Sequence, residues 1–293
     1  MVEFNDRTVL VTGAGRGIGQ ATAEAFGKRG ANVVVNDVGV TKDGSDDATR
    51  PADRTVQLVG EAGGDAVPEY SDIGTMDGAA SAVETAYEEF GRLDVVYNNA
   101  GILRESSLVS MTEDEFDEVI RVHLKGMFAV LQAAAQRWQD EHKSGVKRER
   151  AVVNASSDMA AGAFLEPNSA HGLGNYAMAK AGILGLTRTA AEELTNYDVR
   201  VNAVWPMAET RMTETLPLDL PAPEPVAETV AFLASEECNL TGQTVRVGGD
   251  RVDLVDPAPL PRATAYASDG AWDAEQLAER FEATLGQHVT ELH

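Results

Sequence analysis

A tyrosine and a lysine four residues apart, Tyr176 and Lys180, are the residues whose types and spacing most directly indicate chemistry. In a helix, this spacing places both side chains on one face. An ammonium close to a phenol favours the phenolate and lowers the phenol pKa from about 10. Tyr176 could therefore act as a general base toward an alcohol or as a general acid toward a carbonyl. The pair alone is not specific, because the same spacing arises by chance in most proteins.

A glycine-rich segment, TGAGRGIG at residues 12–19, follows a strand-like run and opens a helix-like one. Glycines permit a tight turn and a close backbone approach to a pyrophosphate, which the helix N-terminus attracts. Glycines also occur in ordinary turns, but here a strand, a turn, a helix and a second strand follow in the required order. We therefore expect Gly13 and Gly19 to contact a dinucleotide.

The second strand-like run ends in Asp37, 18 residues after Gly19. A carboxylate at this position accepts hydrogen bonds from the adenosine ribose and repels a 2′-phosphate, which favours NAD over NADP. Arg16 favours the opposite choice, because an arginine in the glycine turn can pair with that phosphate. We give Asp37 more weight, since Arg16 can turn into solvent or pair with Asp37, whereas a carboxylate facing a phosphate is repulsive.

These residues require a scaffold, and the hydrophobic pattern predicts one. Short β-branched runs alternate with longer helical stretches, which is typical of βαβ units and a parallel sheet covered on both faces. We predict an α/β Rossmann-type fold with a doubly wound, parallel, seven-stranded sheet and helices on both faces. The predicted strands are Thr8–Val11, Asn32–Asn36, Ala66–Tyr70, Asp94–Tyr97, Ala151–Asn154, Arg200–Val204 and Gln243–Val247. The predicted helices are Gly17–Lys28, Pro51–Glu61, Met76–Phe90, Glu113–Glu141, Tyr176–Thr195 and Pro225–Ser235.

Residues 1–255 are predicted to form a single dehydrogenase-type domain. Residues 256–293 are predicted to form an extension, with a proline-rich linker at 256–261 and an amphipathic helix at 274–285. Two further segments, 39–50 and 164–175, are rich in turn residues and look like additions to the common frame.

The composition is strongly acidic, with 47 Asp and Glu against 24 Lys and Arg and a net charge of −23. Such a surface repels phosphate backbones and argues against nucleic-acid binding. It resembles the surfaces of proteins from salt-loving cells, although an ordinary acidic protein is the alternative. Cys238 is the single cysteine and the five histidines lack ligand spacing, so we expect no metal. We recognise neither a signal peptide nor a membrane span, and expect a cytoplasmic protein.

Three motifs, TGAGRGIG (12–19), NNAG (98–101) and YAMAK (176–180), resemble in order and spacing those of the short-chain dehydrogenase/reductase family. The resemblance covers about residues 7–249. It implies an enzyme that uses a nicotinamide cofactor to act on CH–OH groups. A cofactor-sensing binding protein without turnover is the alternative from another class of function.

The resemblance also implies a serine that holds the substrate oxygen beside Tyr176 and Lys180. The fifth strand leads into Ser156 and Ser157, and the family pattern selects Ser157 as the catalytic residue. The interval from Ser157 to Tyr176 is 19 residues, longer than is usual in the family, which indicates an insertion and leaves Ser156 as an alternative.

His123 stands where the family usually has an asparagine that supports a proton-relay water. We include it among the catalytic candidates, with a core or interface histidine as the alternative. The chain also has Met207 after Pro206, where the family normally has glycine, so the backbone path there is in question. The further cofactor contacts implied by the resemblance are Arg16, Ile18, Asp72, Ile73, Asn99, Ala100, Gly101, Pro206 and Thr210, together with Tyr176 and Lys180 at the nicotinamide ribose.

Residues 33–39, 98–108 and 120–128 resemble more closely the (3R)-hydroxyacyl-CoA dehydrogenase domain of the peroxisomal multifunctional β-oxidation enzyme. This resemblance implies a small-molecule alcohol or ketone substrate, with an acyl-CoA favoured. Reduction or oxidation of a sugar, a steroid, another alcohol or a β-ketoacyl carrier protein is the alternative. The helices around Glu113–Glu141 and Tyr176–Thr195 resemble those that form the subunit interface of the short-chain dehydrogenase/reductase family, which implies a homodimer or homotetramer.

Overall fold

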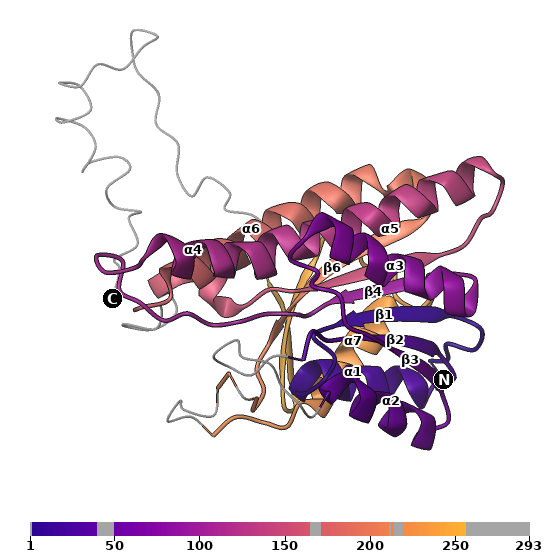
Figure 1. Cartoon of the computed structure of the whole chain (residues 1–293), viewed down its shortest axis with the longest axis horizontal. Helices are drawn as coiled ribbons and strands as arrows, with labels where there is room; N and C mark the ends of the chain where they lie inside the picture. The colour runs from indigo at the N-terminus through magenta and orange to yellow at the C-terminus, as the bar shows by residue number, and fades with distance from the viewer. Residues whose placement is uncertain (1, 40–49, 165–170, 211, 214–218, 256–293) are drawn as a thin grey trace, which may run out of the picture.

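The computed structural model describes residues 2–39, 50–164, 171–210, 212–213 and 219–255. Strands and helices alternate along most of this part of the chain (Figure 1). The strands are β1 (Thr8–Thr12), β2 (Asn32–Asn36), β3 (Asp65–Glu69), β4 (Val95–Asn98), β5 (Arg150–Ala155), β6 (Val199–Pro206), β7 (Thr244–Gly248) and β8 (Arg251–Val255). The helices are α1 (Gly17–Gly27), α2 (Pro51–Glu61), α3 (Met76–Phe90), α4 (Glu113–Ile120), α5 (Gly126–Lys143), α6 (Gly174–Glu193) and α7 (Glu224–Ala234).

The strands form one sheet in the order β3-β2-β1-β4-β5-β6-β7-β8, and the first seven are parallel. Helices α1, α2 and α7 cover one face, and α3, α5 and α6 cover the other (Figure 1). Because both faces are covered, the central strands are continuous apolar runs, such as Val33–Val35. Alternate residues of β1 point to opposite cores, with Val9 and Val11 in one and Leu10 in the other.

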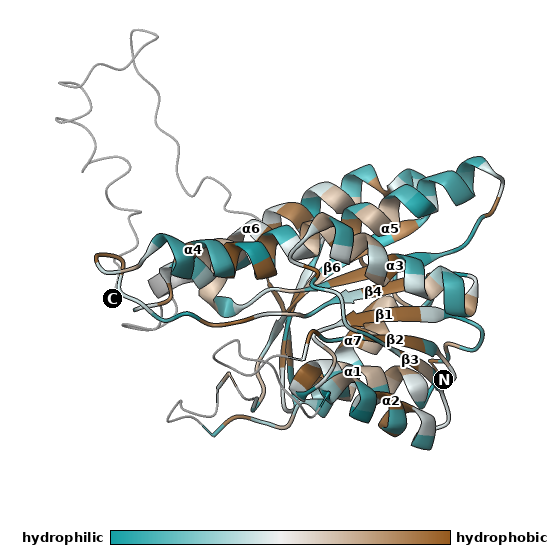
Figure 2. Ribbon diagram, in the orientation of Figure 1, coloured by the Kyte–Doolittle hydropathy of each residue, from teal (hydrophilic) through white to brown (hydrophobic). Residues whose placement is uncertain are grey.

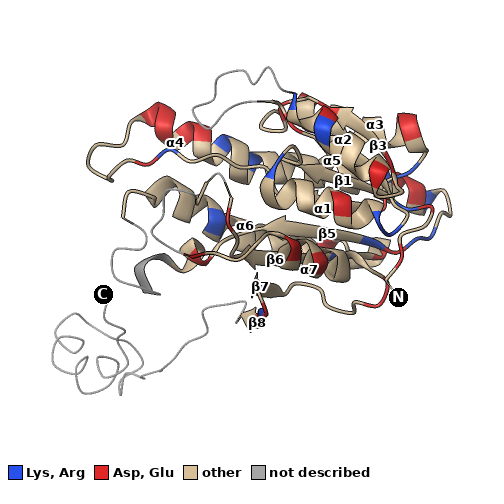
Figure 3. Ribbon diagram, turned by 90° about the horizontal axis from the view of Figure 1, so that it is seen from below, with Lys and Arg blue, Asp and Glu red and all other residues tan. Residues whose placement is uncertain are grey.

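The apolar residues concentrate in the sheet and on the inner faces of the helices (Figure 2). Charged residues lie on the outer helices, and the first turn of α4 alone carries Glu113, Asp114 and Glu115 (Figure 3). A strand order that reverses between β1 and β4 opens a crevice at the carboxyl ends of the strands, where ligands of such sheets bind. The fold thus predicts the position of the functional site.

The predicted strand count was wrong, because the sheet has eight strands instead of seven. Strand β8 pairs antiparallel with β7 through a two-residue loop, Gly249-Asp250, in which Gly249 has φ +58°. Its sequence alternates charged Arg251 and Asp253 with exposed Val252 and Leu254, so it lacks the buried apolar run of the other strands. The Gly-Asp pair is a known hairpin signal and could have predicted the turn.

The single helix predicted over Glu113–Glu141 was also wrong. Helix α4 begins with a capping box, in which Thr112 and Glu115 satisfy each other's backbone N–H groups. A π-helical turn at Arg121–Lys125 then separates α4 from α5, which runs on to Lys143. Such turns are rare and often occur at functional sites, and this one contains His123. A π-helical turn contains about one residue more than an α-helical turn, which changes the hydrophobic periodicity of a long helix too little to be recognised in the sequence.

The other predicted helices and strands agree with the structure to within two residues at each end. Most of the predicted additions, residues 40–49 and 165–170, lie outside the described residues, as do the linker at 256–261 and the helix at 274–285. The division of the chain at residue 255 therefore stays a prediction. No described helix is both long and apolar enough to cross a membrane.

Candidate active site

The candidate residues gather at the carboxyl edge of the sheet, where four central strands end. Strand β1 leads into the glycine turn, β4 into Asn99, β5 into Ser157, and β6 ends at Pro206. Parallel strands bring these ends together although the residues lie far apart in the sequence. Helix α6 then supplies Tyr176 and Lys180 from its first two turns.

The glycine turn is shaped by close backbone contacts that leave no room for side chains. A Cβ atom on Gly13, which has φ +62°, would lie 2.7 Å from Cα of Ala100. One on Gly19 would lie 2.2 Å from the carbonyl oxygen of Gly13. Helix α1 starts here without an acidic residue in its first turn, so its N-terminus keeps its attraction for an anion. Ile18 lies in that first turn. The turn therefore fits the pyrophosphate of a dinucleotide.

Asp37 lies directly over this turn. One carboxylate oxygen accepts a hydrogen bond from the Gly15 N–H at 2.9 Å, and the other accepts from the Gly39 N–H at 2.9 Å. The carboxylate is thereby oriented, while each of its oxygens keeps a second lone pair for a ribose hydroxyl. Arg16 is the N-cap residue of α1, so both residues that bear on the choice between NAD and NADP border the same turn.

The residues after β4 form the next wall of the crevice. The side-chain amide of Asn99 donates to the carbonyls of Thr12 and Gly13, both at 3.1 Å, and so joins this wall to the glycine turn. The Ala100 N–H donates to the Thr12 hydroxyl at 3.2 Å. Gly101 lies against the ring of His123, because a Cβ atom there would be 2.2 Å from its Cε1. Asn99 therefore has a structural bond in addition to its predicted contact with the cofactor.

Asp72 and Ile73, two of the predicted cofactor contacts, are held by the π-helical turn and by Gly126 directly after it. One Asp72 oxygen pairs with the Arg121 guanidinium at 2.6 Å, and the other accepts from the Gly74 N–H at 2.9 Å. Ile73 is buried against Gly126. The irregular turn between α4 and α5 therefore positions this part of the predicted cofactor site.

Met207 follows Pro206 without disturbing the sheet. Its N–H donates to the Val247 carbonyl at 2.8 Å, which continues the pairing of β6 with β7. The side chain fits because Gly248 lies opposite, where a Cβ atom would be 2.7 Å from that of Met207. Thr210 lies beside Gly17 at the start of α1, which brings the loop after β6 to the glycine turn.

The two adjacent serines have different environments. The Ser156 hydroxyl is buried and donates to the main-chain carbonyl of Lys180 at 2.8 Å. The Ser157 hydroxyl is half-buried and forms a side-chain hydrogen bond with Tyr176, which by itself lowers the phenol pKa. The same hydroxyl also donates to one Asp158 carboxylate oxygen at 3.1 Å and accepts from the Met159 N–H at 3.2 Å. This arrangement favours Ser157 over Ser156 as the residue that contacts the substrate oxygen.

Tyr176 and Lys180 adjoin as predicted, with the ammonium nitrogen 5.3 Å from the centre of the phenol ring. Burial raises the pKa of Tyr176 to about 12 and outweighs the hydrogen bond from Ser157. Burial also lowers the pKa of Lys180 to about 7, and its ammonium donates to the Ala155 carbonyl at 2.6 Å. The expected lowering of the phenol pKa is therefore wrong for this structure, because desolvation disfavours both charged forms.

His123 is buried and meets Tyr176 edge to face, with ring centres 5.1 Å apart. Its Nε2 lies 2.8 Å from the Ile102 carbonyl oxygen and 3.1 Å from the Ile102 N–H, so it can donate to the first or accept from the second, depending on the tautomer. Nδ1 has no hydrogen-bond partner among the described residues. Burial lowers the pKa of His123 to about 3, and the charge of Lys180 adds to this effect. The imidazole is thus neutral near pH 7, and in the tautomer that donates to Ile102 its free Nδ1 is an acceptor.

Sequence reasoning missed Asn175, whose side chain contacts the backbone of three segments around the site. Its position directly before Tyr176 was the available signal. It also missed the Arg121 bond to Asp72, which depends on the π-helical turn. Within the described ranges, no group of three or more His, Cys, Asp or Glu side chains is arranged to hold a metal ion.

Comparisons with known proteins agree with this geometry. The short chain dehydrogenase family profile matches residues 7–220. A hydroxyacyl-CoA dehydrogenase of Mycobacterium tuberculosis is 37% identical over 289 residues, which cover 94% of this chain and 87% of that protein. The mouse peroxisomal multifunctional enzyme type 2 is 40% identical over 251 residues, 84% of this chain but only 32% of its own length. The crystal structure of a short chain dehydrogenase from Mycobacterium avium matches with a TM-score of 0.83 and 39% identity, covering 97% of this chain and 95% of that one.

The chain therefore belongs to the short-chain dehydrogenase family, as its three motifs predicted. It is an oxidoreductase of the class that acts on CH–OH groups with a nicotinamide cofactor.

Proposed function

We propose that this enzyme uses NAD to transfer a hydride to or from the hydroxyl-bearing carbon of a 3-hydroxyacyl-CoA. The observation that carries the catalytic part is the cluster of Ser157, Tyr176 and Lys180, which lies at the same carboxyl edge of the sheet as the glycine turn. A cofactor-sensing protein without turnover would not need the phenol and the serine hydroxyl to meet at this place.

In the proposed mechanism, Ser157 donates a hydrogen bond to the substrate oxygen and Tyr176 exchanges a proton with that oxygen. Nicotinamide, when bound, supplies or accepts the hydride. Lys180 holds the nicotinamide ribose and, when protonated, favours the phenolate. Because burial keeps the phenol protonated near pH 7, Tyr176 is ready to act as an acid in ketone reduction.

His123 is proposed to serve the proton relay without being ionised. Its pKa of about 3 excludes a charged imidazole near neutral pH. Its unpartnered Nδ1 is buried and can accept a hydrogen bond from a relay water, while Nε2 holds the ring on Ile102. An imidazole thus takes the place of the amide that the family usually has at this position.

The preference for NAD rests on Asp37. Its carboxylate is fixed over the glycine turn by two backbone N–H groups, so a 2′-phosphate would approach a negative charge that cannot easily turn away. Arg16 borders the same turn and would favour NADP. Its charge is at the end of a long side chain with several rotatable bonds, so its position is set less strictly than that of the Asp37 carboxylate. The fixed group is expected to decide the preference.

Two findings support an acyl-CoA substrate. A relative that covers most of this chain carries the name hydroxyacyl-CoA dehydrogenase, and a second one is a peroxisomal multifunctional enzyme. Arg104 lies in the loop after β4, and its carbonyl accepts from Asn175, directly beside Tyr176. The main chain of Arg104 is thus close to the reaction site, and its guanidinium donates to the neighbouring Leu103 carbonyl at 3.0 Å. We propose that this guanidinium binds a CoA phosphate. The overall charge of −23 opposes such binding, but concentrated salt screens that repulsion.

The test compares kcat/KM for 3-hydroxybutyryl-CoA, longer 3-hydroxyacyl-CoAs, sugars, steroids and simple alcohols, with NAD and NADP, in molar KCl. Arg104→Ala should weaken turnover of the thioesters more than turnover of free alcohols. Arg137→Ala is the matched control, because Arg137 on α5 forms an exposed ion pair with Glu84 on α3. Turnover of a sugar or steroid without any turnover of thioesters would refute the substrate while leaving the family intact.

We also propose a homodimer or homotetramer. Phe128 on α5 and Met178 on α6 are 42% and 47% exposed, on the two helices predicted to form the interface. Light scattering in high salt should show an assembly that Phe128→Glu weakens. A monomeric wild-type protein would contradict this proposal.

A further inference from the structure

Asn175 directly precedes the candidate acid–base residue and is fully buried, yet no motif of the sequence singles it out. It is the second residue of α6, the helix that carries both Tyr176 and Lys180. A buried amide has four hydrogen-bonding positions to satisfy, so its partners show what it holds in place.

The amide oxygen of Asn175 accepts a hydrogen bond from the N–H of Tyr176 at 2.7 Å. The first N–H groups of a helix have no partner within the helix. The N-cap residue, Leu173, supplies no side-chain bond either. Asn175 therefore fixes the backbone of Tyr176 at a place where a helix end would otherwise fray.

The amide nitrogen of Asn175 donates to two main-chain carbonyls, that of Arg104 at 3.0 Å and that of Glu115 at 2.9 Å. Arg104 belongs to the loop after β4, and Glu115 to the first turn of α4. Both amide hydrogens are used, and the reversed amide would set its oxygen against two carbonyl oxygens. The orientation of the side chain is thus determined by its surroundings.

Two further contacts join the same loop to the site. The Ser106 N–H donates to the Gly172 carbonyl at 2.9 Å, just before α6. At the other end of the loop, the Ile102 carbonyl lies 2.8 Å from Nε2 of His123. Asn175 bonds to Arg104, between these two contacts, and its side chain also bonds to the N–H of Tyr176.

We propose that Asn175 is a positioning residue, which sets the place of Tyr176 relative to the loop at residues 102–106 that borders the substrate. This inference rests on the proposed role of Tyr176 in proton transfer. Cofactor binding should change little, although Tyr176 is also a predicted contact of the nicotinamide ribose. Asn175 bonds only to the main chain of Arg104, Glu115 and Tyr176, and most predicted cofactor contacts, including the glycine turn and Asp37, lie on other segments. Loss of the amide should therefore impair proton and hydride transfer while leaving NADH binding intact.

The experiment uses the full chain with Asn175→Ala and Asn175→Asp. The aspartate has nearly the same shape but sets an oxygen against the two carbonyls, so it separates hydrogen bonding from space filling. Asn202→Ala is the matched control. Asn202 is also buried, donates to the Leu240 carbonyl at 2.7 Å and accepts from the Gln243 N–H at 3.1 Å. It lies within β6, and both partners belong to the segment that leads into the amino end of β7, away from Tyr176.

The measurements are kcat and KM for reduction of acetoacetyl-CoA, or of the ketone that the wild type accepts in the substrate panel, and the Kd for NADH by fluorescence. The isotope effect on kcat with deuterated NADH is a further readout. The midpoint of thermal unfolding shows how much each variant is destabilised. Hydrogen exchange of residues 102–106 gives a readout without substrate.

We expect Asn175→Ala to lower kcat by about ten- to a hundredfold and to raise the isotope effect and KM, since small misplacements slow a positioned reaction. The Kd for NADH should stay within about twofold, as expected when only groups used in the chemical step are disturbed. Exchange of residues 102–106 should accelerate. Asn175→Asp should be at least as damaging as Asn175→Ala. Asn202→Ala should lower the unfolding midpoint but leave KM and the isotope effect unchanged.

Two outcomes would overturn the inference. One is a kcat for folded Asn175→Ala within about threefold of wild type. The other is a loss of kcat with KM, isotope effect and exchange of 102–106 unchanged, which would mean only a smaller fraction of folded enzyme. If Tyr176→Phe itself keeps full turnover, the proposed function fails instead.

Discussion

Ionisable side chains are buried at both the amino and the carboxyl ends of the strands, here called the amino edge and the carboxyl edge, but their surroundings differ. At the amino edge, where the strands begin, buried charges have partners of opposite sign. At the carboxyl edge, where the strands end, His123, Tyr176 and Lys180 have no ion-pair partner among the described residues, and burial shifts their pKa values toward the neutral forms. Paired charges of this kind stabilise the fold, whereas the unpaired ionisable groups are the candidates for catalysis.

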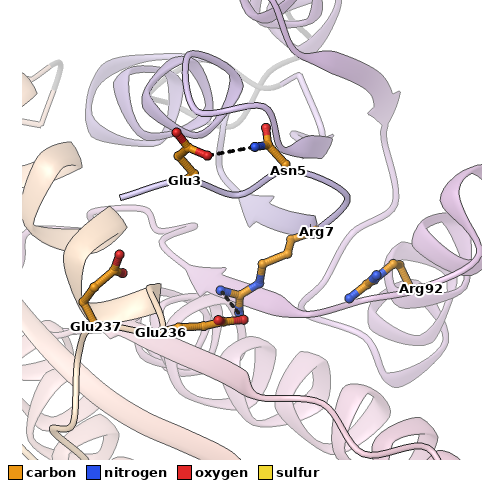
Figure 4. Close-up of a pocket in the computed structure, with 6 residues that line it drawn as sticks. All are labelled: Glu3, Asn5, Arg7, Arg92, Glu236 and Glu237. Carbon is orange, nitrogen blue, oxygen red and sulfur yellow. Dashed lines mark hydrogen bonds and ion pairs between the residues drawn. The ribbon is translucent and has the colours of Figure 1, made fainter. Parts of the chain in front are cut away.

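The amino edge shows the structural use of charge. Asp94 is fully buried and accepts from the Arg92 guanidinium through two bonds of 2.7 Å, and from the Thr8 N–H at 2.8 Å. Arg150 is also fully buried and pairs with Glu141. A polar pocket lies at this edge, lined by Glu3, Asn5, Arg7, Arg92, Glu236 and Glu237, with Arg7 directed at Glu236 (Figure 4). Three acidic and two basic side chains mix there, and the ion pair of Arg7 with Glu236 indicates a structural role.

The carboxyl edge shows the other use. No ion pair of Lys180 is found among the described residues, and desolvation lowers its pKa to about 7. Tyr176 and His123 are shifted by the same cause to about 12 and about 3. Isolated buried groups of this kind cost stability and are typical of functional sites. Among the described residues, these buried groups without ion-pair partners indicate the active site more clearly than a pocket does.

The largest expected effect is at the carboxyl edge. Tyr176→Phe should reduce turnover by about a hundred- to ten-thousandfold, because the group that exchanges the proton is lost. NADH binding, followed by fluorescence, should be unchanged. Tyr197→Phe is the control, since Tyr197 follows α6 and accepts from Gln139 away from the site. Turnover of Tyr176→Phe close to that of wild type would remove Tyr176 from the mechanism.

A paired experiment tests the contrast directly. Arg150→Met should lower the free energy of unfolding by about 3–5 kcal/mol, because it leaves Glu141 without its buried partner. Its kcat per folded molecule should be unchanged. Lys180→Met should show the reverse pattern, with activity lost and the free energy of unfolding unchanged or raised. Denaturant titrations and rate assays measure both, and equal destabilisation by the two variants would break the comparison.

Acid should destabilise the fold through His123. The unfolded chain takes up a proton below about pH 6.5, whereas burial delays this in the folded protein to about pH 3. Stability therefore falls as the pH drops through this window, by about 2 kcal/mol between pH 7 and pH 5 from this residue alone. His123→Asn should lose that part of the pH dependence in denaturant titrations. Identical pH dependence in both proteins would contradict the assignment.

A smaller effect is expected at the fixed carboxylate of the glycine turn. Asp37→Ala should shift the ratio of kcat/KM for NAD over NADP by about tenfold toward NADP, since one screened repulsion is removed. Arg16→Ala should shift the ratio in the opposite direction. If the unmodified enzyme already prefers NADPH, Arg16 dominates the turn and the weighting of the two residues is wrong.

The smallest expected effect per residue is the dependence of the melting temperature on salt. The net charge of −23 should make the melting temperature rise with KCl into the molar range, where the Debye length shrinks to about 3 Å. The enclosed pairs of Asp94 and Arg150 should respond little, so Arg150→Met should show the same salt slope as wild type. A melting temperature independent of KCl would contradict a salt-adapted surface.

Much of this architecture could be predicted because its signals are local. The glycine turn, the carboxylate after β2 and the Tyr176–Lys180 spacing are each encoded within a few residues, and repeating βαβ patterns place them at one edge of a sheet. The strand count failed at β8, where a charged, exposed strand lacks the buried apolar run. The helix over 113–141 failed because one extra residue in a turn leaves the hydrophobic periodicity nearly unchanged.

The sequence by itself thus determined the family, the parallel sheet and the residue types of the catalytic cluster. Only the tertiary structure decided their electrostatics and support. Sequence spacing predicted a lowered pKa for Tyr176, but burial by segments distant in the chain raises it. The same packing brings the carbonyls of Arg104 and Glu115 to Asn175 and separates the roles of Ser156 and Ser157. Desolvation and long-range hydrogen bonds depend on which segments meet, and no local pattern records that.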